Sequence, residues 1–236
     1  MLGIVIPAHD EERVIGDSVR AATAAALHPD LKGERVELLV VLDSCTDATG
    51  ELAAQAGAHT VSVKVRNVGV ARAVGAEALI ARGARWLGFT DADTRVSASW
   101  LVDQLAQNAD AVCGSVGVED WSPHGIHADL LHAHFLETYS DRDGHHHVHG
   151  ANLGVSAEAY RRAGGFQHLA CSEDVALVAA LEATGARVAW SAAPRVVTSA
   201  RREARAAGGF ADALLNAVAF RLATVPQLCL APAGAA

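Results

Sequence analysis

The sequence predicts an α/β protein in which helices flank a central, mostly parallel sheet within a single domain. Short apolar runs alternate with segments of helical periodicity through the first half of the chain, as in successive strand–helix units. The run Val36–Leu42 is predominantly apolar, which is typical of a parallel strand covered on both faces. A chain of 236 residues with 51% hydrophobic content can bury one substantial core.

The first half is expected to contain four strand–helix units followed by a fifth strand. Pro7 ends the first apolar run, and Gly57 and Gly83 follow two of the helical segments, where glycine commonly terminates a helix. Such alternation implies right-handed crossovers between parallel strands. Strands are expected at Leu2–Ile6, Val36–Leu42, Thr60–Val65, Arg85–Thr90 and Ala111–Val118, and helices at Glu11–Leu27, Thr46–Ala56, Val70–Ala81 and Ala98–Gln107.

The second half is less regular. The tail after Pro226 is expected to be loosely ordered, and no internal repeat or linker divides the chain. Helices are expected at Gly125–Tyr139, Ala157–Ala163, Ser172–Thr184 and Phe210–Thr224, strands at His149–Ser156 and Arg187–Trp190, and a polar loop at Ser140–His149.

The charge balance and the cysteines exclude several classes of protein. A net charge of −8 argues against a nucleic-acid partner, which usually needs a basic face. The four cysteines are far apart, so neither a zinc ribbon nor a disulfide framework is indicated. No apolar run approaches the roughly 18 residues of a transmembrane helix. A soluble cytoplasmic protein without a transmembrane segment is therefore expected.

Carboxylates follow two of the expected strands, at the edge where open α/β sheets bind ligands. Asp43 follows the second strand, and Asp91 and Asp93 follow the fourth. In an extended segment residues i and i+2 point the same way, so Asp91 and Asp93 would converge. Two carboxylates so close favour a bound cation, and Mg²⁺ or Mn²⁺ suits oxygen ligands. The alternatives are a solvated turn, or Asp93 as the cap of the next helix.

Five segments occur in an order that resembles the family 2 glycosyltransferases. They are "IVIPAHDEE", "LLVVLDSCTDAT", "WLGFTDADT", "HGANLGVSAEAYRRAGGF" and "SEDVAL", and the resemblance covers Leu2 to Val197. It implies the GT-A (Rossmann-like) fold, with a nucleotide-binding half at 1–118, an acceptor-binding half at 119–225 and a tail at 226–236.

The resemblance also implies an activity. Members of the family move a sugar, with inversion, from a nucleoside-diphosphate sugar to an acceptor hydroxyl. It favours a UDP-linked donor, a divalent metal (Mg²⁺ or Mn²⁺) as cofactor, and a small molecule, glycan or lipid as acceptor. The Q-x-x-R-W segment of processive members is missing, so a single, non-processive transfer is expected.

On the donor side, the resemblance assigns a base contact to Asp43 and metal binding to Asp93, with Asp91 on ribose or metal. The usual Asn of the opening motif is Asp10 here, and the segment that carries Arg72 is shortened. Asp43 could instead cap the following helix, and Arg72 could be a surface residue. The nucleotide-binding residues implied are Pro7, Ala8, His9, Glu11, Asp43, Arg72, Asp91 and Ala92.

On the acceptor side, the resemblance makes Asp174 the general base and Glu173 its alternate. The two acids could instead be an ordinary helix start behind a Ser172 cap. The residues implied near the sugar or acceptor are His149, Gly150, Ala151 and Asn152, and those near the diphosphate are Arg201 and Arg202. Asn152 could instead satisfy buried backbone groups, and the two arginines could begin a solvated helix.

Histidines are concentrated between His124 and His149, where eight of the twelve occur. Histidine is the commonest metal ligand, so a hydrolase-type zinc site is one rival hypothesis. No H-E-x-x-H is present, however, and a loop over the acceptor pocket is favoured, with His149 nearest the substrate.

A second rival is a sugar nucleotidylyltransferase, which usually needs a glycine-rich loop with a lysine, and a third is a non-catalytic nucleotide-sugar-binding module. Metal-dependent donor hydrolysis would exclude the third.

Overall fold

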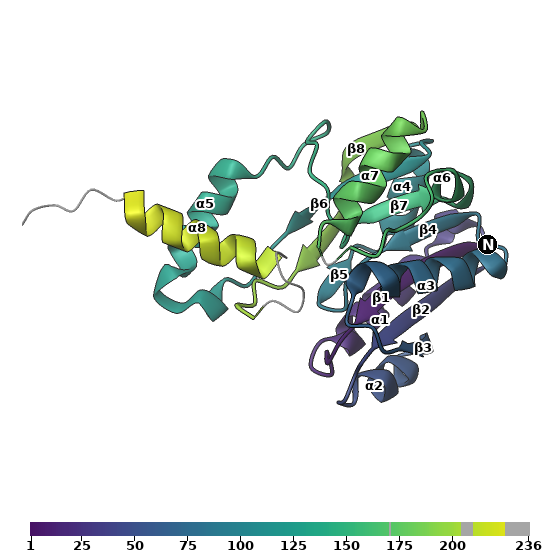
Figure 1. Cartoon of the computed structure of the whole chain (residues 1–236), viewed down its shortest axis with the longest axis horizontal. Coiled ribbons are helices and arrows are strands. Elements are labelled where there is room, and N and C mark those ends of the chain that lie inside the picture. The colour runs from purple at the N-terminus through teal and green to yellow at the C-terminus, as the bar shows by residue number, and fades with distance from the viewer. Residues whose placement is uncertain (170, 204–209, 225–236) are drawn as a thin grey trace, which may run out of the picture.

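The structure is a computed structural model, and it describes residues 1–169, 171–203 and 210–224 (Figure 1). The expected tail at 226–236 lies outside these residues. A single sheet of eight strands has the order β3-β2-β1-β4-β7-β6-β8-β5. The strands are β1 (Leu2–Ala8), β2 (Val36–Asp43), β3 (His59–Val63), β4 (Trp86–Phe89), β5 (Thr94–Val96), β6 (Ala111–Gly117), β7 (Leu153–Ser156) and β8 (Val188–Thr198).

The sheet combines a parallel half with a mixed half. β1 to β4 are mutually parallel. β7 is antiparallel to both of its neighbours, β4 and β6, while β8 runs parallel to β6 and antiparallel to β5. The α/β class and the central sheet within a single domain are thus confirmed.

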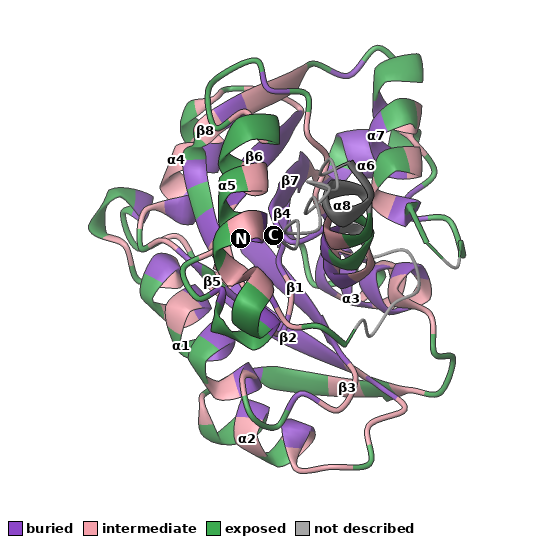
Figure 2. Ribbon diagram, turned by 90° about the vertical axis from the view of Figure 1, so that its left-hand side faces the viewer, coloured by how far each residue is buried: buried purple, intermediate pink, exposed green. Residues whose placement is uncertain are grey.

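Helices cover both faces of the sheet. On β1, Ile4 and Ile6 point into a core with α1 (Ile15–Ala26), α2 (Thr49–Gln55) and α4 (Trp100–Ala106). Val5 points the other way, as alternation along a strand requires, into a core with α3 (Val68–Ala81), α6 (Ala157–Arg162) and α7 (Glu173–Ala183). Figure 2 shows the buried strands between helices whose outward faces are exposed.

A third, smaller core lies beside these layers. Trp121, Leu131 and Leu214 pack together there, from the segment before the 3₁₀ helix η2 (Ser122–His127), from α5 (Ala128–Thr138) and from α8 (Phe210–Thr224). Figure 1 shows α5 and α8 side by side, projecting from the sheet. A short 3₁₀ helix, η1 (Pro29–Leu31), follows α1. None of the described helices is long and apolar enough to cross a bilayer.

Some predicted boundaries are wrong. α2 begins at Thr49 rather than Thr46, because Asp10 accepts the N–H of Thr46 and Asp47 accepts that of Thr49. The helix expected from Gly125 begins only at Ala128, because Gly125 has φ 53° and its non-helical backbone kinks the chain within η2. β8 is far longer than predicted, and β5, its partner of three residues, was not predicted at all.

Candidate active site

A cleft of about 690 Å³ opens at the carboxyl ends of β1, β2 and β4. This is the edge at which parallel α/β sheets bind their ligands. The cleft brings together most of the candidate residues: Pro7, Ala8, His9, Glu11, Asp43, Arg72, Asp91, Ala92, Asp93, His149, Gly150, Ala151, Glu173, Asp174 and Arg201 line it. Asn152 and Arg202 are not among its lining residues.

Asp43 is buried at the end of β2, and it holds the segment that leads into α3. Its Oδ1 accepts the backbone N–H of Val65 at 2.9 Å and of Arg66 at 2.8 Å, and its Oδ2 accepts that of Asn67 at 2.7 Å. Burial alone raises the pKa of Asp43, but these donors outweigh it and leave the pKa lowered. Asp43 therefore faces the cleft as a carboxylate and does not cap α2.

Arg72 is a buried cation that joins two sides of the cleft. It extends from α3, and its Nη2 donates to Asp91 Oδ1 at 2.6 Å, while its Nη1 donates to Glu173 at the start of α7. Burial alone lowers the pKa of Arg72, but the nearby carboxylates outweigh it and raise the pKa. The hypothesis that Arg72 is a surface residue is thus wrong: its side chain is only 5% exposed.

Gly150 makes room for this ion-pair network. A Cβ at Gly150 would lie 2.4 Å from Nη2 of Arg72. The guanidinium cannot simply swing away, because both of its ends are held by carboxylates. Gly150, which was expected near the sugar or acceptor, does line the cleft, and the space that its missing side chain leaves is filled by Arg72.

Asp93 and Glu11 share a second cation, Arg201. The Nη1 of Arg201 donates to both carboxylate oxygens of Glu11, at 2.6 and 2.8 Å, and its Nη2 lies 3.2 Å from Asp93 Oδ2. Burial raises the pKa of Asp93 to about 6, and Arg201 opposes that rise. A largely buried carboxylate of this kind is stabilised by a neighbouring positive charge, which Arg201 supplies.

Asp174 reaches the cleft from the first turn of α7. Its Oδ2 accepts the N–H of Gly150 at 2.7 Å, and its Oδ1 accepts the N–H of Val175 at 2.8 Å. Ser172 makes no side-chain cap and has a left-handed backbone, with φ 59°. The ordinary capped helix start is therefore wrong for this segment.

Asn152 and Arg202 lie elsewhere than expected. The amide of Asn152 is fully buried; it donates to the carbonyls of Ser115 and Pro194 and accepts from Trp100 Nε1. Asn152 therefore satisfies buried polar groups, and its placement beside the sugar is corrected. Arg202 is exposed and is not among the residues that line the cleft, so the structure does not bring it to the site beside Arg201.

The histidine tract is packed and hydrogen-bonded. His147 stacks on Tyr139 at 4.2 Å and on His145 at 5.3 Å, and its Nε2 accepts the N–H of Ser140. His149 continues the tract into the cleft, where its Nε2 lies 3.0 Å from the Tyr139 hydroxyl. The sequence did not point to Tyr139, because a tyrosine at the end of a helix gives no local sign that it will contact a residue of the cleft.

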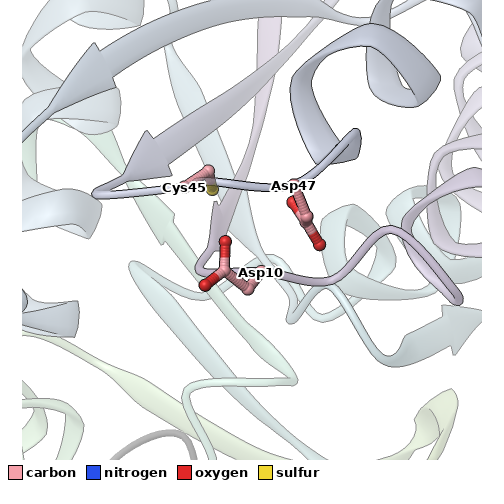
Figure 3. A group of neighbouring side chains, drawn as sticks. All are labelled: Asp10, Cys45 and Asp47. Atoms are coloured by element: carbon pink, nitrogen blue, oxygen red, sulfur yellow. The ribbon is translucent and has the colours of Figure 1, made fainter.

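One group of potential metal ligands was also missed. Asp10, Cys45 and Asp47 have ligand atoms within 4.8 Å of one another, and no other such trio occurs in the described part of the chain (Figure 3). The histidines form no such trio there. Asp10 already accepts the backbone N–H of Thr46, Asp47 accepts those of Thr49 and Glu12, and Cys45 Sγ contacts the carbonyl of Ala8. These contacts join the β1 and β2 loops beside the cleft.

Open α/β sheets bind nucleotides and other ligands in a crevice at this edge. Residues 3–164 match the model of glycosyl transferase family 2, and the chain belongs to this family. The protein is thus a glycosyltransferase, and the nucleotidylyltransferase hypothesis is not supported. The comparison with curated protein sequences found no match.

Solved glycosyltransferase structures share the fold. S. aureus TarS 1–349 in complex with UDP-GlcNAc superposes with a TM-score of 0.63 at 13% identity, over 95% of this chain and 67% of that one. The mannosyltransferase PcManGT from Pyrobaculum calidifontis, in complex with GDP-Man and Mn²⁺, gives 0.59 at 17% identity, over 86% and 58%. Glucosyl-3-phosphoglycerate synthase from Mycobacterium tuberculosis, in complex with phosphoglyceric acid, gives 0.57 at 20% identity, over 86% and 72%.

Proposed function

We propose that this glycosyltransferase moves one sugar, with inversion, from a UDP-linked donor to an acceptor hydroxyl, and that Asp174 is the general base. One observation carries the proposal: the cleft holds the carboxylates of Asp91 and Asp93 together with that of Asp174, which a backbone N–H fixes in place. Inversion requires the base and the leaving group on opposite faces of the anomeric carbon. Donor-side and base-side carboxylates carried by different elements suit that need.

Asp174 suits the role of base better than Glu173 does. Glu173 is buried and paired with Arg72, so a proton taken up there would break an ion pair. Asp174 is half-buried, lines the cleft and is held through one oxygen by Gly150. A positioned carboxylate that accepts the acceptor's proton during attack contributes typically 10²–10⁴-fold to the rate.

The donor-side residues fit a divalent cation. Asp91 and Asp93 offer carboxylate oxygens, the ligands that Mg²⁺ and Mn²⁺ prefer, and the metal would share these carboxylates with Arg72 and Arg201. When bound, the metal would neutralise charge on the diphosphate of the leaving group. Arg201 is held by Glu11 within the same cleft and would face the diphosphate as a second cation. Among solved neighbours, the mannosyltransferase complex contains Mn²⁺.

The donor can be tested directly. The neighbours' complexes contain UDP-GlcNAc and GDP-Man, so these two donors, UDP alone and GDP alone form a matched thermal-shift panel, each with Mn²⁺ or with EDTA. A ligand that binds the native state raises the melting temperature by mass action. We expect UDP compounds with Mn²⁺ to give the largest rise. A larger rise with the GDP compounds would contradict the UDP assignment, and equal rises with EDTA would contradict the metal.

A further inference from the structure

We propose that Tyr139 holds His149 in the neutral tautomer protonated at Nδ1, so that His149 presents a hydrogen-bond donor to a substrate oxygen beside Asp174. The inference assigns Tyr139 as a positioning residue, although it is not among the residues lining the cleft. The tautomer follows from the hydrogen bonds alone. Only the identity of the oxygen, a hydroxyl of the sugar or acceptor, rests on the proposed function.

The hydroxyl of Tyr139 has two partners, and they decide its direction. It accepts the backbone N–H of Val116 at 2.8 Å, and it lies 3.0 Å from His149 Nε2. A phenol has a single hydrogen to donate. If His149 carried its proton on Nε2, that phenolic hydrogen would have no acceptor among the described residues. The arrangement in which Tyr139 donates to an unprotonated Nε2 gives both the phenolic hydrogen and Nε2 a partner.

Both side chains keep the charge state that this arrangement needs at neutral pH. Burial raises the pKa of Tyr139 to about 12, so its hydroxyl stays protonated. Burial, with a smaller contribution from His147, lowers the pKa of His149 to about 4, while Asp174 and Asp91 oppose the change. A neutral imidazole has one N–H, and with Nε2 accepting, that N–H is at Nδ1.

The ring of Tyr139 is held in place by two aromatic neighbours. It stacks on Phe135 at 4.6 Å with an interplanar angle of 13°, and on His147 at 4.2 Å with an angle of 10°. His147 is itself fixed, because its backbone N–H donates to His145 Nδ1 and its ring accepts the N–H of Ser140. The position of the phenolic oxygen is therefore fixed before any ligand binds.

Nδ1 of His149 has no partner within the described part of the protein. It is not fully shielded from solvent, and because the His149 side chain lines the cleft, we infer that Nδ1 is open to the cleft. The adjacent Gly150 donates its N–H to Asp174. A ligand there meets an N–H donor and a carboxylate acceptor together. That pair suits a compound with two hydroxyl groups, one losing its proton to Asp174 and the other accepting from His149.

The same geometry argues against His149 as a fallback general base. A base must offer a lone pair to the acceptor hydroxyl, and the ring nitrogen that faces the cleft already carries a hydrogen. The other ring nitrogen is occupied by the Tyr139 hydroxyl. His149 is thus a binding residue whose proton stays in place.

The chain supplies a matched control, because it contains only two tyrosines. The hydroxyl of Tyr160 accepts the N–H of Phe166 in the core, and Tyr160 does not line the cleft. Long-range ¹H–¹⁵N spectra of the ligand-free protein report which ring nitrogen carries the hydrogen, and His149→Asn identifies the signal. We expect Nδ1–H in the wild type and in Tyr160→Phe, and a mixture of tautomers in Tyr139→Phe. A wild-type ring protonated at Nε2, or an unchanged ring in Tyr139→Phe, would overturn the proposal.

The contact with substrate has a separate readout. UDP release from UDP-GlcNAc with Mn²⁺ is compared for His149→Ala, which removes the ring, and His149→Asn, whose amide nitrogen lies where Nδ1 was. We expect roughly a tenfold loss for His149→Ala, the usual worth of one hydrogen bond, and a smaller loss for His149→Asn. A wild-type rate in His149→Ala overturns the substrate contact. A wild type without turnover counts against the proposed donor, and the tautomer result stands independently.

Discussion

Arg72 and Glu173, which are 101 residues apart in the chain, form a buried ion pair at the base of the cleft. The same guanidinium binds Asp91, so one side chain connects the end of β4 with the start of α7. These contacts fix the end of β4 relative to the start of α7. Asp174 follows Glu173 in the first turn of α7, so the same contacts also position its carboxylate.

Removing one partner of this pair should be costly. Arg72→Met leaves Glu173 buried without its cation, and we expect a loss of about 3–5 kcal/mol in the free energy of unfolding, as for other broken buried pairs. Adding Glu173→Gln to Arg72→Met should recover part of the loss, because the unpaired charge is then gone. Urea denaturation measures both variants. If the double variant is less stable than Arg72→Met alone, Glu173 is not stabilised by Arg72.

Gly150 should tolerate no side chain. A Cβ there meets the guanidinium of Arg72, which is tied at both ends, so Gly150→Ala should cost about 1–3 kcal/mol of stability and reduce turnover as well. Gly117→Ala is the control: at Gly117 the added Cβ would meet only the carbonyl of Val196, at 3.7 Å, an ordinary contact. Thermal denaturation of the two variants would show this. Equal melting temperatures for Gly150→Ala and Gly117→Ala would argue against a tightly fitted Arg72.

The raised pKa of Asp93 makes stability depend on pH. The folded pKa of about 6 lies above the ordinary value of 3.8, so the native state binds the proton more tightly. The charged carboxylate therefore destabilises the ligand-free fold; the effect is absent below about pH 4, grows up to about pH 6 and is complete above it. We expect Asp93→Asn to be more stable than the wild type at pH 7.5 by roughly 1–3 kcal/mol, since each pKa unit corresponds to about 1.4 kcal/mol.

At pH 4 that difference should vanish, which calorimetry at the two pH values would test. The same variant should lose the effect of Mn²⁺ on donor binding, because the carboxylate that binds the metal is gone. A variant less stable than the wild type at pH 7.5, with Mn²⁺ still required, would show that Asp93 is a structural partner of Arg201 alone.

Local patterns predicted the strands and the carboxylates that follow them, because strand periodicity and polar residues at strand ends are encoded within a few residues. Asp43, Asp91 and Asp93 were found in this way. Asn152 was misplaced because its partners, Trp100, Ser115 and Pro194, are distant in sequence.

Side-chain contacts and strand pairings between segments that are distant in the chain could not be predicted from sequence patterns. The contact of Arg201 with Glu11 spans 190 residues. β5 has three residues and gains its order from pairing with β8, so it has too few residues to show a period. The role of Tyr139 likewise depends on His149 and Val116, which approach it through the loop after α5 and through β6.

The central claim, that Asp174 accepts the proton of the acceptor, is tested most directly by Asp174→Asn. The change keeps size and polarity but removes the basic carboxylate. Asp129→Asn is the control, because Asp129 is an exposed acid in the first turn of α5 and reports any effect of helix-start charge. The measurement is the rate of sugar transfer beside the thermal shift given by the donor. We predict an unchanged shift for both variants and a rate lowered roughly 10²–10⁴-fold in Asp174→Asn only. Transfer by Asp174→Asn at near the wild-type rate would contradict the claim.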